Sequence, residues 1–168
     1  MNIYTKTGDE GTTGSFGGQR FRKDDLIIEL NGCIDECIAG VESLILKESI
    51  ERNLKQLNRV YDALYILGAE ISSGKTTNIP KVISQGFVDK LENLIDEFDI
   101  NLTVFQRFTT EKGVLANELR VRVRKLERVL TKMLRVKALR PVTYAYINRL
   151  SDYVFALSIS YERETSLE

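Results

Sequence analysis

Three arginines in the segment ELRVRVRKLERVL recur at every fourth residue: Arg120, Arg124 and Arg128. Residues four apart lie on one face of an α-helix, so these side chains would form a row along a helix. The positive charges repel one another along such a row, and a bound anion that bridges them relieves this repulsion. Phosphate is a suitable anion because the planar guanidinium group can donate two hydrogen bonds to its oxygens. The row, with Glu127 beside it, indicates a phosphate site, although a solvated helix face has the same pattern.

The segment TKTGDEGTTGSFGGQRFRKDD, residues 5–25, is rich in glycine and threonine. Glycine backbone can approach a phosphate closely and present N–H donors, and Lys6, Arg20 and Lys23 add positive charge. The segment lacks the Gly-Lys-Ser/Thr ending of a Walker loop. Its composition is equally typical of an unstructured tail, so both interpretations stay open at this point.

Two further polar positions occur in segments with helical spacing. Asn148 shares a face with Asp152 in YINRLSDYVF. The asparagine can pair with an adenine edge, whereas Arg149 and Asp152 can instead form an ion pair within the helix. Asp35 lies beside an apolar stripe and is either a surface carboxylate or the partner of a distant arginine such as Arg120.

The chain contains no histidine and two cysteines. The absence of histidine excludes a Ser-His or Cys-His catalytic pair and any histidine-ligated metal or haem. Cys33 and Cys37 lie four apart in a helical pattern, which is poor geometry for a disulfide and supplies too few ligands for zinc. We therefore expect two small buried apolar side chains and no protein-ligated metal.

The net charge is zero, with 24 basic and 24 acidic residues. Residues 111–140 nevertheless hold ten Lys and Arg against three Asp and Glu. A basic strip in a neutral protein indicates one anionic ligand rather than general affinity for nucleic acid. No apolar run approaches the roughly 20 residues of a membrane-spanning helix. The N-terminus resembles neither a signal nor a transit peptide, so we expect a cytoplasmic protein.

Helical periodicity dominates after the opening segment. Apolar residues recur in three- and four-residue steps over 25–47, 50–73, 83–98, 111–136 and 141–162. The stripe of the last span comprises Tyr144, Ile147, Leu150, Val154 and Leu157. Because strand-like alternation is weak, we predict an all-α protein: a five-helix up-and-down bundle over 25–162, preceded by a glycine-rich segment, 1–24, within one domain of 1–168.

Together these segments resemble the PduO-type ATP:cob(I)alamin adenosyltransferases. The matching motifs keep their order and cover nearly the whole chain: TKTGDEG, GQRFRK, GCIDE, LGAE, RVRVRKLER and NRLSD. The resemblance implies transfer of the 5′-deoxyadenosyl group of ATP to cob(I)alamin, which releases triphosphate. It also implies a homotrimer, with ATP held between the N-terminal segment of one subunit and the fourth and fifth helices of its neighbour.

The resemblance assigns roles residue by residue. The implied ATP contacts are Thr5, Lys6, Thr7, Gly8, Thr13, Gly14, Lys23, Arg124, Lys125, Glu127, Arg128 and Asn148. Asp35 and Arg120 match an intersubunit salt bridge of the family. Cob(I)alamin is itself a strong nucleophile, so the protein positions the substrates and stabilises the leaving triphosphate. Arg124, Arg128 and Lys23 would do this together with Mg²⁺ held mainly by the ATP phosphates.

The family binds cobalamin without a lower axial ligand and places a hydrophobic side chain beneath the cobalt, which agrees with the missing histidine. Phe105 and Phe108 are the candidates, and the spacing to Arg120 favours Phe105. Some positions depart from the family pattern near the expected corrinoid pocket. FTTEKG replaces a Leu-Pro-Gly-Gly turn, LANEL replaces a Leu-His pair, and Lys125 replaces an arginine.

Two other functions fit parts of the sequence. The altered turn favours a non-catalytic ATP-binding or corrinoid-carrying bundle. The basic span favours a nucleic-acid-binding protein, but the neutral total charge and the absence of an aromatic platform oppose it. For the adenosyltransferase, the further implied partners are a cobalamin reductase and an adenosylcobalamin-dependent enzyme.

Overall fold

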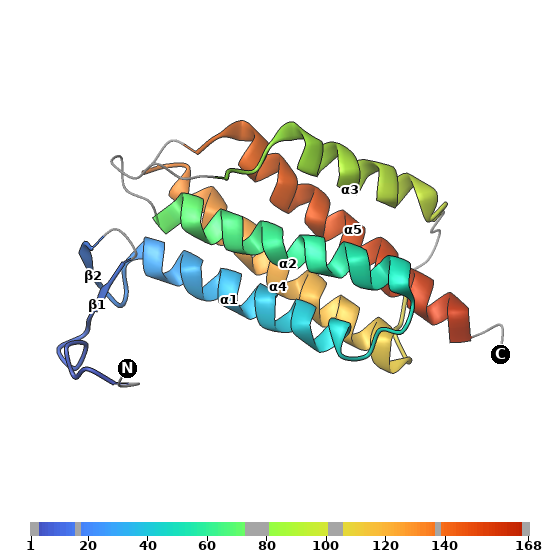
Figure 1. Ribbon diagram of the computed structural model, residues 1–168, viewed down its shortest axis with the longest axis horizontal. Coiled ribbons are helices and arrows are strands. Elements are labelled where there is room, and N and C mark those ends of the chain that lie inside the picture. The colour runs from blue at the N-terminus through green and yellow to red at the C-terminus, as the bar shows by residue number, and fades with distance from the viewer. Residues whose placement is uncertain (1–3, 16–17, 73–80, 101–105, 137–138, 166–168) are drawn as a thin grey trace.

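The described residues form a bundle of five helices, each antiparallel to the helix before it (Figure 1). The computed structural model describes residues 4–15, 18–72, 81–100, 106–136 and 139–165. The helices are α1, Leu26–Ile45; α2, Glu51–Ser72; α3, Gln85–Glu97; α4, Glu111–Met133; and α5, Pro141–Thr165. This architecture confirms the predicted up-and-down bundle. No described helix is long and apolar enough to cross a membrane.

The helix ends follow local chemistry. Thr110 precedes α4, and its side-chain hydroxyl accepts a hydrogen bond from the backbone N–H of Gly113 at 3.0 Å. Pro141 occupies the first position of α5, where its missing N–H costs nothing. The helix α5 continues to Thr165, beyond the predicted end at residue 162, because Tyr161 in its last turns is still buried in the core.

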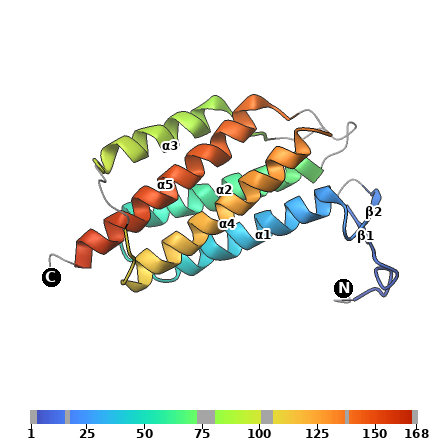
Figure 2. The same ribbon diagram turned by 180° about the vertical axis from the view of Figure 1, so that it is seen from behind.

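The main helix contacts run in the order α2, α1, α4, α5, α3, so that α4 is the central helix and packs against α1 and α5 (Figures 1 and 2). The predicted stripe of α5 is confirmed by the burial of Ile147, Leu150, Val154 and Leu157, whereas Tyr144 is only half-buried. Three tyrosines that the stripe did not include are almost fully buried: Tyr146, Tyr153 and Tyr161. They are covered because α5 lies between α3 and α4.

A short antiparallel hairpin precedes the bundle. The strands β1, Thr12–Gly14, and β2, Arg20–Arg22, pair with Thr13 opposite Phe21. Arg20 ties this hairpin to the residues before it, because one guanidinium nitrogen donates to the Thr7 carbonyl and to the Thr12 hydroxyl, each at 2.5 Å. The weak alternation of the sequence did not predict these strands. The alternative of an unstructured tail is wrong for the described part of this segment.

Both cysteines are buried and free, as predicted. Burial raises the pKa of the Cys37 thiol to about 12, so this side chain stays protonated at neutral pH. Cys33 and Cys37 therefore act as small apolar residues of the α1 core face.

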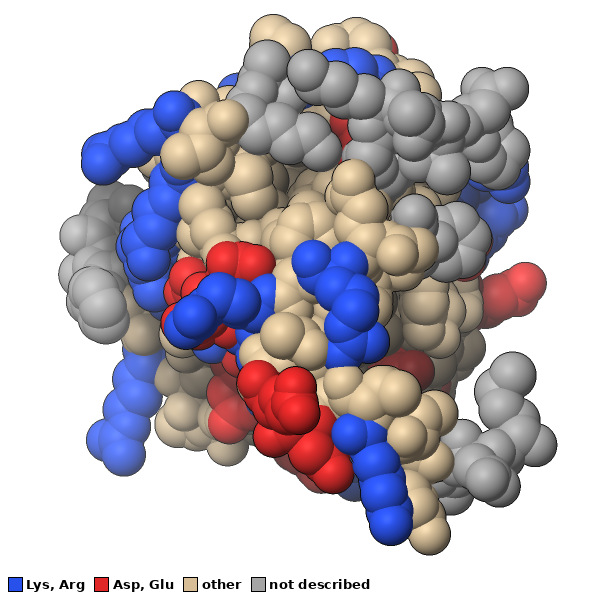
Figure 3. Space-filling model, turned by 90° about the vertical axis from the view of Figure 1, so that its left-hand side faces the viewer, with Lys and Arg blue, Asp and Glu red and all other residues tan. Residues whose placement is uncertain are grey.

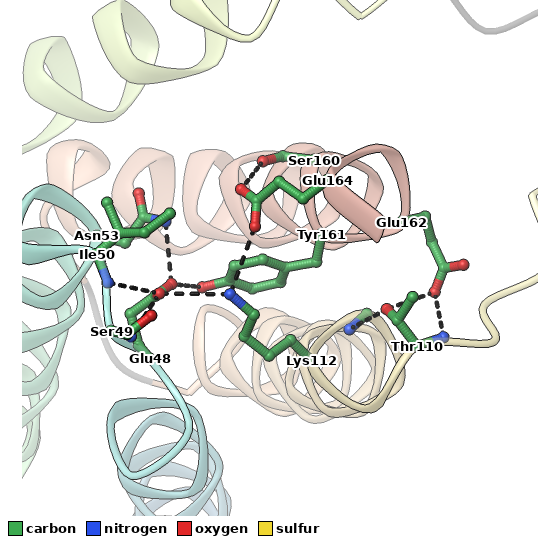
Figure 4. A network of polar contacts seen from close by, with 11 residues as sticks. Glu48, Ser49, Ile50, Asn53, Thr110, Lys112, Ser160, Tyr161, Glu162 and Glu164 are labelled. Atoms are coloured by element: carbon green, nitrogen blue, oxygen red, sulfur yellow. Dashed lines mark hydrogen bonds and ion pairs between the residues drawn. The ribbon is translucent and has the colours of Figure 1, made fainter. Parts of the chain in front are cut away.

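Two carboxylates, the buried Glu48 and the partly buried Glu70, stabilise opposite ends of the bundle. At one end, Glu48 accepts hydrogen bonds from the Tyr161 hydroxyl at 2.5 Å and the Asn53 amide at 3.0 Å (Figure 4). At the other end, Glu70 forms a bidentate pair with Arg140, at 2.8 and 2.9 Å, and accepts from the Thr143 hydroxyl. Each carboxylate links α2, or the loop before it, to α5.

We expect the protein to lose stability in acid because of Glu48, Glu70 and Glu162. Burial acts to raise the pKa of each carboxyl, but the hydrogen bonds that each accepts outweigh burial, and all three pKa values lie below the ordinary 4.5. A carboxyl with a depressed pKa contributes stability that is complete above its unfolded pKa and is lost as pH falls through its folded pKa. Urea denaturation should therefore give a free energy of unfolding that falls below about pH 4.5.

The matched control is Glu48→Gln, which removes one of the three titrating groups. Its free energy of unfolding should fall less steeply with acid than that of the wild-type protein. Equal slopes in the two proteins would contradict the assignment to Glu48.

Candidate active site

The helix α4 places the predicted arginine row along one face. Arg124 and Arg128 are exposed, and neither forms an ion pair or hydrogen bond with another residue that the structure describes. Arg120 is half-buried; its Nε donates to Asn117 at 2.9 Å, and its guanidinium lies 5.3 Å from the centre of the Phe155 ring. Burial, and then the charge of Arg124, lower the pKa of Arg120. The row thus presents two uncompensated cations.

Asn148 of α5 lies at the same level as Arg128. The hydroxyls of Thr131 and Tyr144 are hydrogen-bonded at 3.0 Å, and this contact defines the register of the antiparallel helices α4 and α5. Arg128 is one turn before Thr131, and Asn148 is one turn after Tyr144. The two residues therefore lie at one level of neighbouring helices, and their joint contact with ATP remains a prediction.

Other polar residues of this region have partners within the chain. Arg149 pairs with Asp152 at 3.4 Å, as the spacing allowed, and with Glu92 of α3 at 2.8 Å. Lys125, a predicted ATP contact, forms an ion pair with Glu36 of α1 at 2.6 Å. Contact between Lys125 and ATP remains a prediction and would compete with this ion pair.

The N-terminal segment gathers several other predicted ATP contacts. Lys6 has a positive φ of 59°, and the hydroxyls of Thr5 and Thr7 lie 2.8 Å apart. Gly8 faces Lys23: a Cβ atom added at Gly8 would lie 3.5 Å from the Lys23 ammonium and 3.1 Å from the Thr12 carbonyl oxygen. The glycine thus leaves its backbone accessible beside a cation. Thr13 and Gly14 belong to β1 in the adjoining hairpin.

No described side-chain hydrogen bond or ion pair joins the two halves of the predicted site within one chain. The side-chain hydrogen bonds described for residues 4–23 stay within that segment or reach Asp24 and Asp25. Asp35 is exposed, and the described contacts of Arg120 do not include it. A pairing of Asp35 with Arg120, which the resemblance places between subunits, stays a prediction.

The corrinoid side of the predicted site is described in part. Phe108 is half-buried just before α4, whereas Phe105 lies outside the described residues. A cavity of about 780 Å³ opens elsewhere, between α2 and α3. Its lining includes Arg59, Phe87 and Tyr146 and none of the predicted site residues. Within the described ranges, no cluster of three or more cysteine and carboxylate side chains could hold a metal ion.

Sequence reasoning missed the role of Arg140. Arg140 belongs to the basic strip of residues 111–140, but its charge is balanced by Glu70 of the LGAE segment. The pair spans α2 and the start of α5, so it helps to place the helix that carries Asn148. The spacing within either segment contains no signal for this contact.

The end of the molecule that bears the hairpin mixes charges of both signs. Figure 3 shows acidic and basic side chains next to one another on this face.

The family model "Cobalamin adenosyltransferase" matches residues 3–161 of the chain. The protein belongs to this family. It is 35% identical over 162 residues to a corrinoid adenosyltransferase of Citrobacter freundii, covering 93% of this chain and 92% of that protein. It is also 32% identical to the corrinoid adenosyltransferase PduO of Salmonella typhimurium, but spans only 49% of that longer protein.

A solved structure shares the fold of this family member. It is a variant PduO-type ATP:corrinoid adenosyltransferase from Lactobacillus reuteri complexed with cobalamin and ATP. Its TM-score is 0.84 at 24% identity, covering 97% of this chain and 96% of that one. At this identity the likeness shows the architecture alone.

Proposed function

We propose that the protein transfers the 5′-deoxyadenosyl group of ATP to cob(I)alamin, forming adenosylcobalamin and triphosphate. The observation that carries the proposal is the pair of exposed arginines without ion-pair partners in the described structure, Arg124 and Arg128, at the level of Asn148. Two guanidinium groups on one helix face suit a triphosphate, and an asparagine beside them suits an adenine edge. Family membership supports the same reaction.

The reaction needs no activated protein nucleophile. The electron pair of Co(I) attacks C5′ of ATP, the C5′–O5′ bond breaks, and its electrons leave with the triphosphate. Negative charge therefore develops on the leaving group, where Arg124 and Arg128, together with Lys23 of a neighbouring subunit, stabilise it. Mg²⁺ bound to the ATP phosphates would supply further positive charge.

The assembly that completes this site is a homotrimer. Within one chain no described side-chain hydrogen bond or ion pair joins the N-terminal contacts to the α4 row, and a neighbouring subunit brings them together. The N-terminal half comprises Thr5, Lys6, Thr7, Gly8, Thr13, Gly14 and Lys23, and the helical half comprises Arg124, Lys125, Glu127, Arg128 and Asn148. Asp35 and Arg120 then pair between subunits.

The corrinoid occupies a pocket bounded by the segment before α4. Phe105 or Phe108 lies beneath the cobalt in place of an axial ligand, because the chain has no histidine to supply one. A four-coordinate Co(II) is easier to reduce to Co(I), since no axial donor raises the energy of the acceptor orbital. In the cytoplasm, a cobalamin reductase would supply the electron, and an adenosylcobalamin-dependent enzyme would accept the product.

A direct assay tests the reaction. Purified protein, MgATP and chemically reduced cobalamin should give the absorption spectrum of adenosylcobalamin, with triphosphate as the second product. Light scattering should give three times the mass of the chain. Tight ATP binding without turnover would instead favour a non-catalytic ATP-binding or corrinoid-carrying bundle.

A further inference from the structure

One carboxylate of α5 holds the two residues that precede α4. Glu162 Oε1 accepts hydrogen bonds at 2.8 Å from the backbone N–H of Thr109, the backbone N–H of Thr110 and the Thr110 hydroxyl. Its Oε2 accepts from the Thr109 hydroxyl at 2.9 Å. Figure 4 shows Glu162 pointing from α5 towards Thr110. Four hydrogen bonds to one charged group form a strong local anchor.

The first turn of α4 leaves room for this anchor. A Cβ atom added at Gly113 would lie 2.3 Å from Glu162 Oε1 and 2.7 Å from the Thr110 hydroxyl oxygen. Both distances are far below van der Waals contact, so an alanine at this position would displace the carboxylate. Glycine lowers helix propensity here, and its presence is explained by the space that Glu162 occupies.

The other hydrogen bonds described for residues 106–110 are local: Gln106 bonds to Arg107, and Thr110 bonds to Gly113 and Val114 of the first turn of α4. Residues 106–109 are neither helical nor extended into a strand, and the two prolines of the sequence are Pro80 and Pro141. Phe108 directly precedes the anchored pair. Glu162 thus ties the residue that follows Phe108 to α5.

We propose that Glu162 is a positioning residue for the corrinoid side of the active site. By holding Thr109 and Thr110, it sets where Phe108 meets the corrinoid. This inference rests on the proposed adenosyltransferase function and adds a residue that acts through the altered FTTEKG turn.

The ATP side lies far from this anchor. Asn148 is 14 residues from Glu162 on α5, which corresponds to about 21 Å along the helix axis. Arg124 is likewise 14 residues from Thr110 along α4. Loosening the anchor should therefore change binding of the corrinoid and leave binding of ATP unchanged.

Steady-state kinetics of Glu162→Gln test the inference. We expect the KM for cob(I)alamin to rise about tenfold while the KM for ATP stays within about twofold. The matched control is Glu164→Gln, since Glu164 bonds to Lys112 and Ser160 and has no described contact with Thr109 or Thr110. A purely stabilising role would lower the melting temperature and change neither KM, and that result would overturn the inference.

Two further variants keep the test independent of any one substitution. Gly113→Ala displaces the carboxylate without removing it and should raise the same KM. Thr109→Val removes one hydroxyl at constant shape and should raise this KM, whereas Thr109→Ser should restore it to the wild-type value. Unchanged cob(I)alamin KM values in folded variants contradict the inference alone, whereas a wild-type protein without turnover contradicts the proposed function.

Discussion

Replacing Arg128 with alanine should lower kcat/KM for adenosyl transfer by about 10²- to 10³-fold. The side chain is exposed, and the described structure gives it no partner to stabilise, so the substitution should not disturb the fold. Its expected role is to meet the charge that develops on the leaving triphosphate. Because this charge grows as the C5′–O5′ bond breaks, most of the loss should fall on kcat.

The variant Arg128→Lys separates charge from geometry. Lysine keeps the positive charge but lacks the planar fork, so its activity should lie between those of Arg128→Ala and the wild-type protein. The control is Arg135→Ala, which removes an exposed arginine just beyond the end of α4 and should leave kcat/KM unchanged. Undiminished activity of Arg128→Ala in the adenosylation assay would contradict the phosphate assignment.

Replacing Glu48 with glutamine should lower the free energy of unfolding by about 3 kcal/mol. The Glu48 side chain is fully buried. It accepts hydrogen bonds from Tyr161, Asn53 and the backbone N–H groups of Ser49 and Ile50. Lys112 lies 3.4 Å away (Figure 4). A glutamine of the same size would turn one acceptor oxygen into an NH₂ donor that faces other donors.

Thermal denaturation measures this loss. For a chain of this size, the change corresponds to a fall in melting temperature of roughly 10 °C. Glu164→Gln is the control, because its carboxylate is 40% exposed and bonds weakly, at 3.4 Å, to Lys112. We expect this control to lose less than about 1 kcal/mol. A Glu48→Gln variant as stable as the control would show that the buried network contributes little.

The sequence predicted most of the helical architecture because the relevant signals are local. The period of an α-helix places residues three and four apart on one side, so the burial of Ile147, Leu150 and Val154 can be derived from their spacing. The same period placed Arg124 and Arg128 on one face. The predicted helix ends differ from the observed ones by only a few residues, because the ends depend on caps and on packing against neighbouring helices.

The N-terminal segment shows where local signals fail. Its hairpin has three-residue strands, too short for an alternating pattern to stand out. Arg20 donates hydrogen bonds to Thr7 and Thr12 and so stabilises the hairpin. These contacts form only when the hairpin has brought the residues together, so the sequence does not show them. Composition alone therefore predicted either a tail or a phosphate loop.

The tertiary structure decided which distant side chains meet. Glu48 and Tyr161 are 113 residues apart, and Glu70 and Arg140 are 70 apart. These contacts depend on which helix faces pack together and in what register. That packing is set by many weak contacts summed over the core. The sequence by itself determined the helices, their buried faces and the arginine row. The packing decided that Asn148 lies at the level of Arg128 on the neighbouring helix and that Glu162 anchors the start of α4.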